Sequence, residues 1–594
     1  MNTCISENVF VGYFGCTERS SHKIVSTQRD GLSLKQIDDS LKLLVKGQDC
    51  STFSWEGGFV LTVGQILGGA DDNSVSLDAE AVARLYQARG VEISGEFDGV
   101  FAIVLWDAGE NKLYLWRDDS GGKLLYFYQN ENNDLWFANN LKLLLSFTGK
   151  RPVSRLGLSE YLRFLDISPP YTMFEGVFSL EPEKYVCLGP GEMVACKSKP
   201  EPLEKTWGRL GSFDEVVSSF DVLLRKSIAT RIESNPRTGA FLSGGIDSSL
   251  VCAVAADLRK DIKAVTVGFH DAQFDEAPVA CNVAGHLGIE HEVLRFSLED
   301  DLRALHLFTA TVGSPFADPA IIPTFQCFEK TGVEFDLVLD GTGADTLIGM
   351  MPARHLRFIL GYSAHLPTQM RKVIAGVLRL AGPAKRYGDL FDFDDPAELM
   401  IRWKGWSKAE ITELCGYPCD LEHTLFYRIY RAGFSKNTPY ELYSSLMGNL
   451  PDDRIHQSSA VFGPEVAFPF FDPIVRSFVR SLPHEYRYTP DEPKRLFRSL
   501  LGRYVPQAIW DVPKHGFDYP FEQLLRYRDD FLLGEYLSPE ALAHHGFFNP
   551  AVVDSYLKQF RAGDLSLRFK IWALVMFQAW YRNFYLALSD EMAS

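Results

Sequence analysis

One short segment carries most of the chemistry that this sequence predicts: Ser243-Gly-Gly-Ile-Asp-Ser-Ser249. It lies between an apolar run that predicts a strand and a stretch that predicts a helix. Its glycines permit a tight turn with exposed N–H groups, its hydroxyls add donors, and the helix start adds partial positive charge. Asp247 would repel phosphate unless a cation lay between them, and Mg2+ binds a few carboxylates together with phosphate oxygens. A well-capped strand-to-helix turn is the alternative, but the aspartate and the serines favour a site for ATP and Mg2+.

The residues around this segment supply the elements that must hold it. Short apolar runs alternate with stretches of helical patterning through the middle of the chain. The expected helices span 213–231, 248–258 and 277–287, and the expected strands span 239–242, 264–268, 291–296 and 335–339. This alternation predicts an α/β fold with a doubly wound parallel sheet. Beyond about residue 350 the patterning is mostly helical.

The first third of the chain predicts a β-rich domain instead. Aromatic and aliphatic runs at 101–106, 113–116 and 124–128 are separated by turn-forming residues, a pattern that predicts successive hairpins. Further strands are expected within 185–194.

The length of the chain and one polar stretch together predict two domains. A chain of 594 residues is too long for one ordinary core. The stretch 196–205 is polar and contains prolines, which is typical of a linker. We therefore expect one domain at 1–200 and a second at 206–594.

Charge and cysteine usage exclude other classes of protein. Acidic residues number 77 against 60 basic ones, for a net charge of −17, which argues against a nucleic-acid partner. The ten cysteines lack metal-site spacing, since Cys415 and Cys419 form a lone pair without a second pair or a nearby histidine. Ordinary thiols in a reducing compartment are the better interpretation. No signal peptide or membrane span is recognisable, so we expect a cytoplasmic protein.

The phosphate segment also carries a resemblance to a known group of enzymes. S-G-G-x-D-S-S is the pyrophosphatase loop of the N-type ATP pyrophosphatases, among them the asparagine synthetases, which cleave ATP between its α- and β-phosphates. Later segments resemble asparagine synthetase motifs in the expected order: Asp340-Gly-Thr-Gly-Ala-Asp345, Phe468-Pro-Phe-Phe-Asp-Pro473, the K-x-x-L-R segment Lys494 to Arg498, and Pro513-Lys-His-Gly-Phe517.

The resemblance implies roles for particular residues. Asp247 and Asp345 would bind Mg2+, and Lys514 would contact the α-phosphate and the departing pyrophosphate as the catalytic cation. The strand 265–269 would face the adenine. The residues that would contact ATP are Leu242, Ser243, Gly244, Gly245, Asp247, Ser248, Ser249, Val267, Gly268 and Gly341.

The N-terminal domain resembles class II glutaminase domains, which implies an Ntn-type sandwich. The segments 98–107 and 117–126 carry this likeness. Class II glutaminases need a cysteine at the mature N-terminus, because its free amine activates its own thiol. Here Asn2 follows Met1, and Cys4 is the first cysteine; the asparagine of the family's N-G-E-I oxyanion segment is Val63. These two changes predict a domain without glutaminase activity.

The synthetase half also departs from the family pattern. The two glutamates of the family's S-G-E-G-A-D-E segment are Thr342 and Thr346, and the usual aspartate–arginine pair is His456–Gln457. The arginine before the P-F-L-D segment is Ala467. These positions surround the acyl acceptor, whereas the ATP and metal residues are kept. We therefore expect the same chemistry on a different substrate.

Two branches of the family lack the N-terminal cysteine: β-lactam-forming synthetases and lasso peptide cyclases. The β-lactam branch has a tyrosine at the position of Thr342, and threonine is a poor proton acceptor. The long helical segment 351–434, rich in Arg, Leu, Phe and Tyr, is either packing helices or the wall of a larger cavity, and the second interpretation favours a peptide substrate.

The favoured hypothesis is therefore a lasso peptide cyclase, an AMP-forming carbon–nitrogen ligase. Its implied partners are a precursor or core peptide, a leader-binding protein and a leader peptidase. A small-molecule cyclising or ammonia-dependent amide synthetase is the first alternative. A nucleotide-binding scaffold whose catalysis has decayed is the second, and retention of Asp247, Asp345 and Lys514 argues against it.

Overall fold

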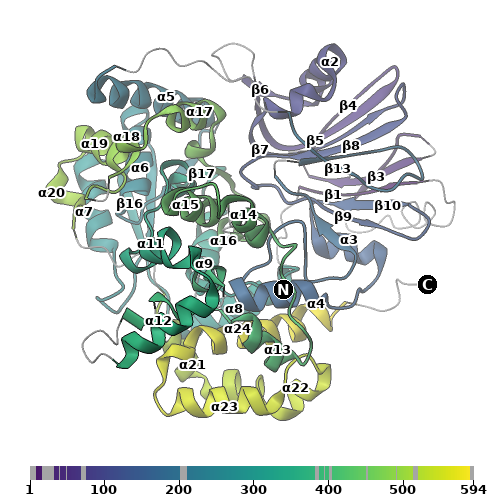
Figure 1. Ribbon diagram of the computed structural model, residues 1–594. Coiled ribbons are helices and arrows are strands. Elements are labelled where there is room, and N and C mark those ends of the chain that lie inside the picture. The colour runs from purple at the N-terminus through teal and green to yellow at the C-terminus, as the bar shows by residue number, and fades with distance from the viewer. Residues whose placement is uncertain are drawn as a thin grey trace.

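The computed structural model describes residues 8–588, apart from 16–31, 39, 48–49, 69–74, 183, 201–210, 234, 381–386, 389, 394, 401–404, 450–452, 490 and 513–518. The N-terminal part is built of two β-sheets, and the remainder combines a parallel sheet with many helices (Figure 1). The α/β class with a β-rich N-terminal domain is confirmed. None of the helices in these ranges is both long and apolar enough to cross a membrane.

The N-terminal domain is a sandwich of two antiparallel sheets. The first sheet has the order β11 (Val177–Ser179), β9 (Tyr126–Gln129), β10 (Leu135–Ala138), β1 (Val9–Phe14), β3 (Leu41–Lys46) and β2 (Ser33–Gln36). The second has the order β13 (Cys196–Ser198), β12 (Lys184–Leu188), β8 (Lys112–Arg117), β7 (Asp98–Asp107), β5 (Gly58–Gly68) and β4 (Cys50–Trp55), with β6 (Val75–Leu77) paired to β5. Alternate residues of both sheets, such as Phe14 and Leu43 from one and Leu61 and Val104 from the other, form a core between them.

The first expected hairpin, between the runs at 101–106 and 113–116, is present. The second, between the runs at 113–116 and 124–128, is wrong. β7 and β8 pair as a hairpin, but β9 pairs with β10 and β11 in the other sheet. The chain changes sheets at Asp118, whose carboxylate accepts hydrogen bonds from the N–H groups of Gly122 at 2.7 Å and Lys123 at 2.9 Å. Leu125 and Phe127 are then buried between the two sheets, and this burial holds β9 in the first sheet.

The domain also contains helices that the expected β-rich pattern did not include. These are α2 (Ala79–Arg89), α3 (Leu141–Thr148) and α4 (Arg155–Phe164). α2 covers the outer face of the second sheet, and α4 is almost completely buried.

The predicted doubly wound sheet is confirmed. Its five parallel strands have the order β16 (Glu290–Leu294), β15 (Lys263–Val267), β14 (Thr238–Phe241), β17 (Leu337–Leu339) and β18 (Glu465–Ala467). The helices between and before these strands are α5 (Phe213–Glu233), α6 (Ile246–Leu258), α7 (Ala277–Leu287), α8 (Leu298–Thr311) and α9 (Ile321–Thr331). From β14 the chain first adds strands on one side and then returns to add β17 on the other. The C-terminal ends of β14 and β17 therefore form a topological switch point, where open α/β sheets bind ligands.

The remainder of the chain is helical, as expected, apart from β18. Its helices are α10 (Ala344–Ile348), α11 (Arg354–Gly361), α12 (Thr368–Leu380), α13 (Lys408–Cys415), α14 (Leu425–Gly433), α15 (Pro439–Asn449), α16 (Asp453–Phe462), α17 (Pro473–Ser481), α18 (His484–Arg487), α19 (Arg495–Tyr504), α20 (Gln507–Trp510), α21 (Phe521–Tyr527), α22 (Pro539–His545), α23 (Pro550–Arg561) and α24 (Arg568–Trp580).

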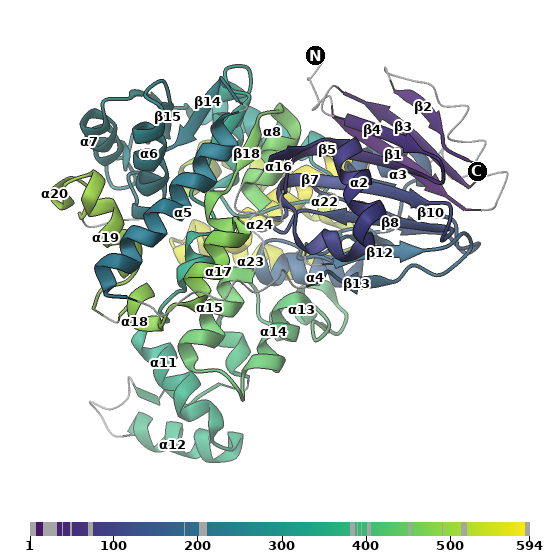
Figure 2. The same ribbon diagram turned by 90° about the horizontal axis from the view of Figure 1, so that it is seen from above.

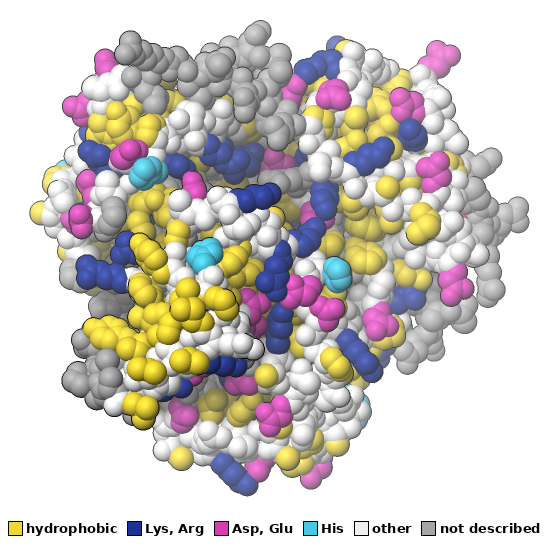
Figure 3. Space-filling model, in the orientation of Figure 1, with side chains coloured by type: hydrophobic (Ala, Val, Ile, Leu, Met, Phe, Trp, Pro, Cys, Tyr) yellow, Lys and Arg dark blue, Asp and Glu magenta, His cyan; other side chains and the backbone are white. Residues whose placement is uncertain are grey.

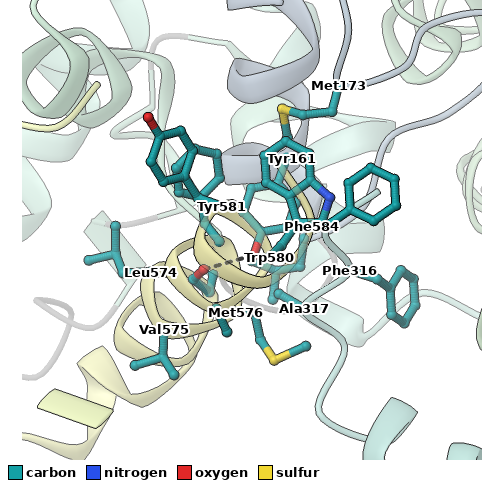
Figure 4. Close-up of a cluster of buried hydrophobic side chains, with 14 of the residues drawn as sticks. Tyr161, Met173, Phe316, Ala317, Leu574, Val575, Met576, Trp580, Tyr581 and Phe584 are labelled. Carbon is teal, nitrogen blue, oxygen red and sulfur yellow. Dashed lines mark hydrogen bonds between the residues drawn. The ribbon is translucent and has the colours of Figure 1, made fainter. Parts of the chain in front are cut away.

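The C-terminal helix α24 joins the two halves of the molecule in one core. Figure 4 shows its side chains packed around Tyr161 of α4 and Met173, both from the N-terminal part. The Tyr161 hydroxyl donates a hydrogen bond of 2.7 Å to the Ala573 carbonyl. Trp580 is fully buried in the same cluster, beside Phe174. The halves therefore share apolar packing rather than a polar contact surface alone.

A buried ion cluster adds a second link between the halves. Arg231 of α5 contacts Asp98 at the start of β7 and, at 3.2 Å, Asp472. The Arg231 side chain is only 3% exposed. Burial raises the pKa of Asp98 even though the neighbouring guanidinium acts in the opposite direction.

Replacing Arg231 with Met should destabilise the protein by roughly 3–5 kcal/mol, because two carboxylates would be left in a buried site without their cation. Urea unfolding followed by tryptophan fluorescence measures this change. Arg237→Met is the control, since the Arg237–Asp336 pair is exposed and should contribute no more than about 1 kcal/mol. Equal unfolding midpoints for the two variants would contradict a structural role for the cluster.

Candidate active site

The loop between β14 and α6 has the shape that its sequence predicts. Gly244 has a φ of +77°, and a Cβ there would lie 3.0 Å from the Ala280 nitrogen, so both the conformation and the space require glycine. The Ser248 hydroxyl oxygen accepts a hydrogen bond of 3.1 Å from the Ser243 N–H and lies 2.9 Å from the Ser243 hydroxyl. These contacts close the loop on itself at the start of α6.

A second loop, between β17 and α10, contacts the first. A Cβ added at Gly341 would lie 2.9 Å from the backbone nitrogen of Ser248, so only glycine permits the two loops to approach so closely. Asp340 holds the second loop in shape by accepting a hydrogen bond of 2.7 Å from the Thr342 N–H. Both loops leave the C-terminal ends of adjacent strands, as the switch point requires.

Two carboxylates from these loops converge on one cation, the ammonium group of Lys494. The Lys494 Nζ lies 2.5 Å from an oxygen of Asp247 and 2.8 Å from an oxygen of Asp345. Burial lowers the pKa of Lys494, but the two carboxylates outweigh this effect and raise it above its ordinary value. Asp247 and Asp345 are thus close enough together to bind a single positive centre.

This geometry fits Mg2+. The described residues include no group of three or more His, Cys, Asp or Glu side chains that could hold a metal by itself. Mg2+ suits a pair of carboxylates because it takes its other ligands from phosphate oxygens and water. The Lys494 ammonium marks the position between the carboxylates where positive charge is favourable.

Lys494 is a candidate site residue whose place between the two carboxylates the sequence did not predict. It precedes α19 and has a φ of +57°, an uncommon backbone conformation for a residue other than glycine. Its K-x-x-L-R segment resembles a family motif, but no sequence pattern places Lys494 beside Asp247, which lies far away along the chain. The predicted cation Lys514 lies outside the described residues.

Most of the residues expected to contact ATP line one cavity. Those that do are Leu242, Ser243, Gly245, Asp247, Ser248, Val267, Gly341 and, as the second metal residue, Asp345. Gly244, Ser249 and Gly268 are not among the described residues that line it. Ser249 is fully buried, and the Gly268 N–H donates a hydrogen bond of 2.8 Å to the Leu294 carbonyl. Their contacts with ATP remain predictions.

The cavity has a volume of about 1100 Å3 and extends well beyond the two loops. Leu124, Tyr126 and Tyr171 of the N-terminal part line one side of it. The helical part supplies an apolar wall that consists of Met350, Leu356, Leu399, Met400, Leu425, Ile429, Tyr443 and Met447. Five of these eight residues come from the segment 351–434, for which the sequence left packing helices and a cavity wall as alternatives.

Four of the five positions in the synthetase half that depart from the family pattern lie at this cavity, whereas Ala467 is buried in β18. Thr342, Thr346, His456 and Gln457 all line the cavity. The Thr346 hydroxyl donates a hydrogen bond of 2.9 Å to the Gly448 carbonyl, and the His456 ring lies 5.2 Å from that of Phe468. The substitutions therefore change the part of the site next to the nucleotide loop.

The fold and the site define a two-domain enzyme, in which a glutaminase-like sandwich is joined to a nucleotide-binding α/β synthetase. The sequence model of asparagine synthase matches residues 219–582, and that of the glutamine amidotransferase domain matches residues 69–198. The chain belongs to the asparagine synthase family and is an ATP-dependent, AMP-forming carbon–nitrogen ligase.

Individual curated relatives have low sequence identity to this chain but align with most of its length. The glutamine-hydrolysing asparagine synthetase 1 of Bacillus subtilis (strain 168) is 24% identical over 85% of this chain and 80% of its own length. A putative asparagine synthetase of Mycobacterium tuberculosis (strain H37Rv) is 25% identical over 85% of this chain and 80% of its own. Among solved structures, the glutamine phosphoribosylpyrophosphate amidotransferase of B. subtilis is 12% identical over 48% of this chain and 65% of its own, with a TM-score of 0.21.

Proposed function

We propose that this ligase adenylates a side-chain carboxylate of a peptide and joins the acyl group to the peptide's own N-terminal amine, closing a macrolactam as lasso peptide cyclases do. The observation that carries the proposal is the cavity of about 1100 Å3, which extends from the nucleotide loop to a wall of apolar side chains. A single amino acid and ammonia would not need such a wall, whereas a peptide buries apolar side chains on binding.

The first step forms the acyl-adenylate. A carboxylate oxygen of the peptide attacks the α-phosphorus of ATP, and the bond from that phosphorus to the bridging oxygen of pyrophosphate breaks. The loop from Ser243 to Ser248 supplies N–H and hydroxyl donors for the phosphates. Asp247 and Asp345 would hold Mg2+, which when bound neutralises charge on the phosphates. Lys494 lies where its ammonium group can stabilise the same charge, and Lys514 is proposed to act beside it.

The second step forms the amide. The peptide's amine attacks the acyl carbon, the bond from that carbon to the AMP oxygen breaks, and the amine loses a proton. The enzyme's contribution to this step is to hold the amine close to the acyl carbon, which removes most of the entropic cost of ring closure. The apolar wall is the surface that would hold a folded peptide in this way.

The test is ATP-dependent mass loss. The enzyme is incubated with ATP, Mg2+ and a synthetic core peptide encoded by a neighbouring short gene, and the product is analysed by intact mass. We expect a species lighter than the linear peptide by one water, together with AMP and pyrophosphate. Amide formation from free aspartate and ammonia, with no dehydrated peptide, would instead identify a small-molecule ligase. Absence of pyrophosphate release with every carboxylate would indicate a decayed scaffold.

We also propose that the N-terminal domain, assigned to residues 1–200 ahead of a synthetase domain at 206–594, does not hydrolyse glutamine. Val63, at the position of the family's oxyanion asparagine, is fully buried within β5, and its side chain has no N–H to donate. The enzyme would then work in the cytoplasm with a leader-binding protein and a leader peptidase that prepare the precursor peptide.

Cys4→Ala should leave ATP-dependent product formation unchanged, because the proposed nucleophile is the peptide's own amine rather than ammonia released from glutamine. Cys4 lies outside the described residues, so this prediction depends on sequence alone. Glutamate release from glutamine is measured in parallel for the wild type and the variant. Glutaminase activity that is present in the wild type and lost in Cys4→Ala would contradict the proposal.

A further inference from the structure

Helix α12 carries a stripe of large apolar side chains that face solvent. Met370, Val373, Val377 and Leu380 are 54%, 67%, 62% and 89% exposed. Their spacing of three, four and three residues places them on one face of the helix. Scattered exposed apolar residues are ordinary, but a continuous stripe along a whole helix indicates an interaction surface.

The stripe is the densest part of a larger exposed apolar patch. Phe358 and Tyr362 of the α11 region and Tyr387 beyond α12 are also exposed. Figure 3 shows hydrophobic side chains gathered over the area that α11 and α12 occupy in Figure 1. In Figure 2 the two helices extend away from the body of the molecule, with α12 outermost.

The segment that contains this patch has the opposite charge from the rest of the chain. Residues 346–388 contain seven Lys and Arg and no Asp or Glu, in a chain whose net charge is −17. On α12 itself, Lys372 and Arg379 are exposed beside the stripe, and Arg379 forms an ion pair of 2.6 Å with Asp392. On α12, two basic side chains therefore flank the apolar stripe.

The opposite face of α12 is fixed to the protein. Arg371 is buried, its guanidinium stacks 3.9 Å from the Phe393 ring centre, and it donates hydrogen bonds to the Phe393 and Leu366 carbonyls. Ala375 is buried on the same side. The apolar stripe thus lies on the face of α12 opposite to its contacts with the protein.

We propose that α12 docks this enzyme on an anionic lipid surface, with the stripe Met370–Val373–Val377–Leu380 inserted at the boundary between headgroups and acyl chains. An amphipathic helix with an apolar face and basic flanks binds in this way, and its strength depends on both the apolar area and the attraction to anionic lipid. A projecting, convex helix can reach a flat surface without interference from the body of the protein. The inference does not depend on the peptide substrate proposed above.

Flotation with lipid vesicles tests the proposal on the full chain. We expect binding to vesicles of equal parts phosphatidylcholine and phosphatidylglycerol, much weaker binding to phosphatidylcholine alone, and weakening as salt is raised. The double variant Val373→Ser/Val377→Ser should bind at least about tenfold more weakly than the wild type, because it removes apolar area without adding charge. The matched control is Val222→Ser/Val333→Ser, which changes two valines that are 64% and 83% exposed elsewhere on the surface.

A second variant examines the charge without altering the stripe. Lys372→Gln should weaken binding by about fivefold at low salt, whereas Lys558→Gln on α23 should have no effect. All variants should keep the wild-type rate of ATP–pyrophosphate exchange, which confirms that they fold. Three results would overturn the proposal: no binding to either vesicle, equal binding to both vesicles, or unchanged binding by the Val373/Val377 double variant. Any of them would favour a protein partner for the patch.

Discussion

Asp247→Asn should lower ATP–pyrophosphate exchange by on the order of 10³ while leaving the fold intact. The Asp247 carboxylate lies 2.5 Å from the Lys494 ammonium, where the proposed Mg2+ and the phosphates of ATP would meet. Asparagine has nearly the same shape but no charge, so the change removes half of the negative charge that holds the cation. Asp345→Asn should have a similar effect, because Asp345 lies 2.8 Å from the same ammonium.

The matched control is Asp257→Asn, which makes the same chemical change on the same helix. Asp257 is 51% exposed and pairs with Arg225 at the far end of α6. Exchange is measured with labelled pyrophosphate over a range of Mg2+ concentrations, and partial recovery at high Mg2+ is expected for the two site variants only. Near-normal exchange in Asp247→Asn or Asp345→Asn would show that the metal ligands are assigned wrongly.

Lys494→Ala should lower turnover by about 10²–10³ with a much smaller change in ATP affinity, because a fixed charge near the phosphates stabilises the transition state more than the ground state. Lys494→Arg should recover little, since a planar guanidinium does not replace a compact ammonium between two carboxylates. Turnover and ATP binding are measured side by side. Lys514→Ala, made in parallel, is expected to have a loss of similar size.

The two lysines can be distinguished by their response to Mg2+. Lys494 contacts both proposed metal ligands, so its removal should change the Mg2+ concentration needed for half-maximal exchange. Lys514→Ala should lower the maximal rate at an unchanged Mg2+ requirement. Wild-type turnover in Lys494→Ala would mean that its contacts with Asp247 and Asp345 serve only to hold α19 in place.

The parallel sheet and its two functional loops could be predicted because they depend on local sequence. Each strand is a short apolar run, and the glycines Gly244 and Gly341 mark turns that other residues would block. The pairing of Asp247 with Asp345 was implied by the resemblance to asparagine synthetase motifs, and the structure places both residues where the strand order reverses. The strands and glycine turns, which depend on local sequence pattern, could therefore be predicted.

Features that depend on distant contacts could not be predicted in the same way. Lys494 approaches Asp247 only after α19 packs against α6, and no spacing rule connects the two residues. The path of the chain from β8 to β9 depends on which sheet buries Leu125 and Phe127. β18 has only three residues, which is too short for a recognisable strand pattern.

The shared core around α24 also bears on the history of the chain. Tyr161 and Met173 of the sandwich pack directly on the last helix of the synthetase. A lineage that no longer used the first domain could not simply delete it, because deletion would strip the apolar cover from Trp580 and its neighbours. Such an arrangement couples retention of the N-terminal domain to the stability of the synthetase half. Whatever chemistry the N-terminal domain performs, its side chains therefore complete the hydrophobic core of the synthetase.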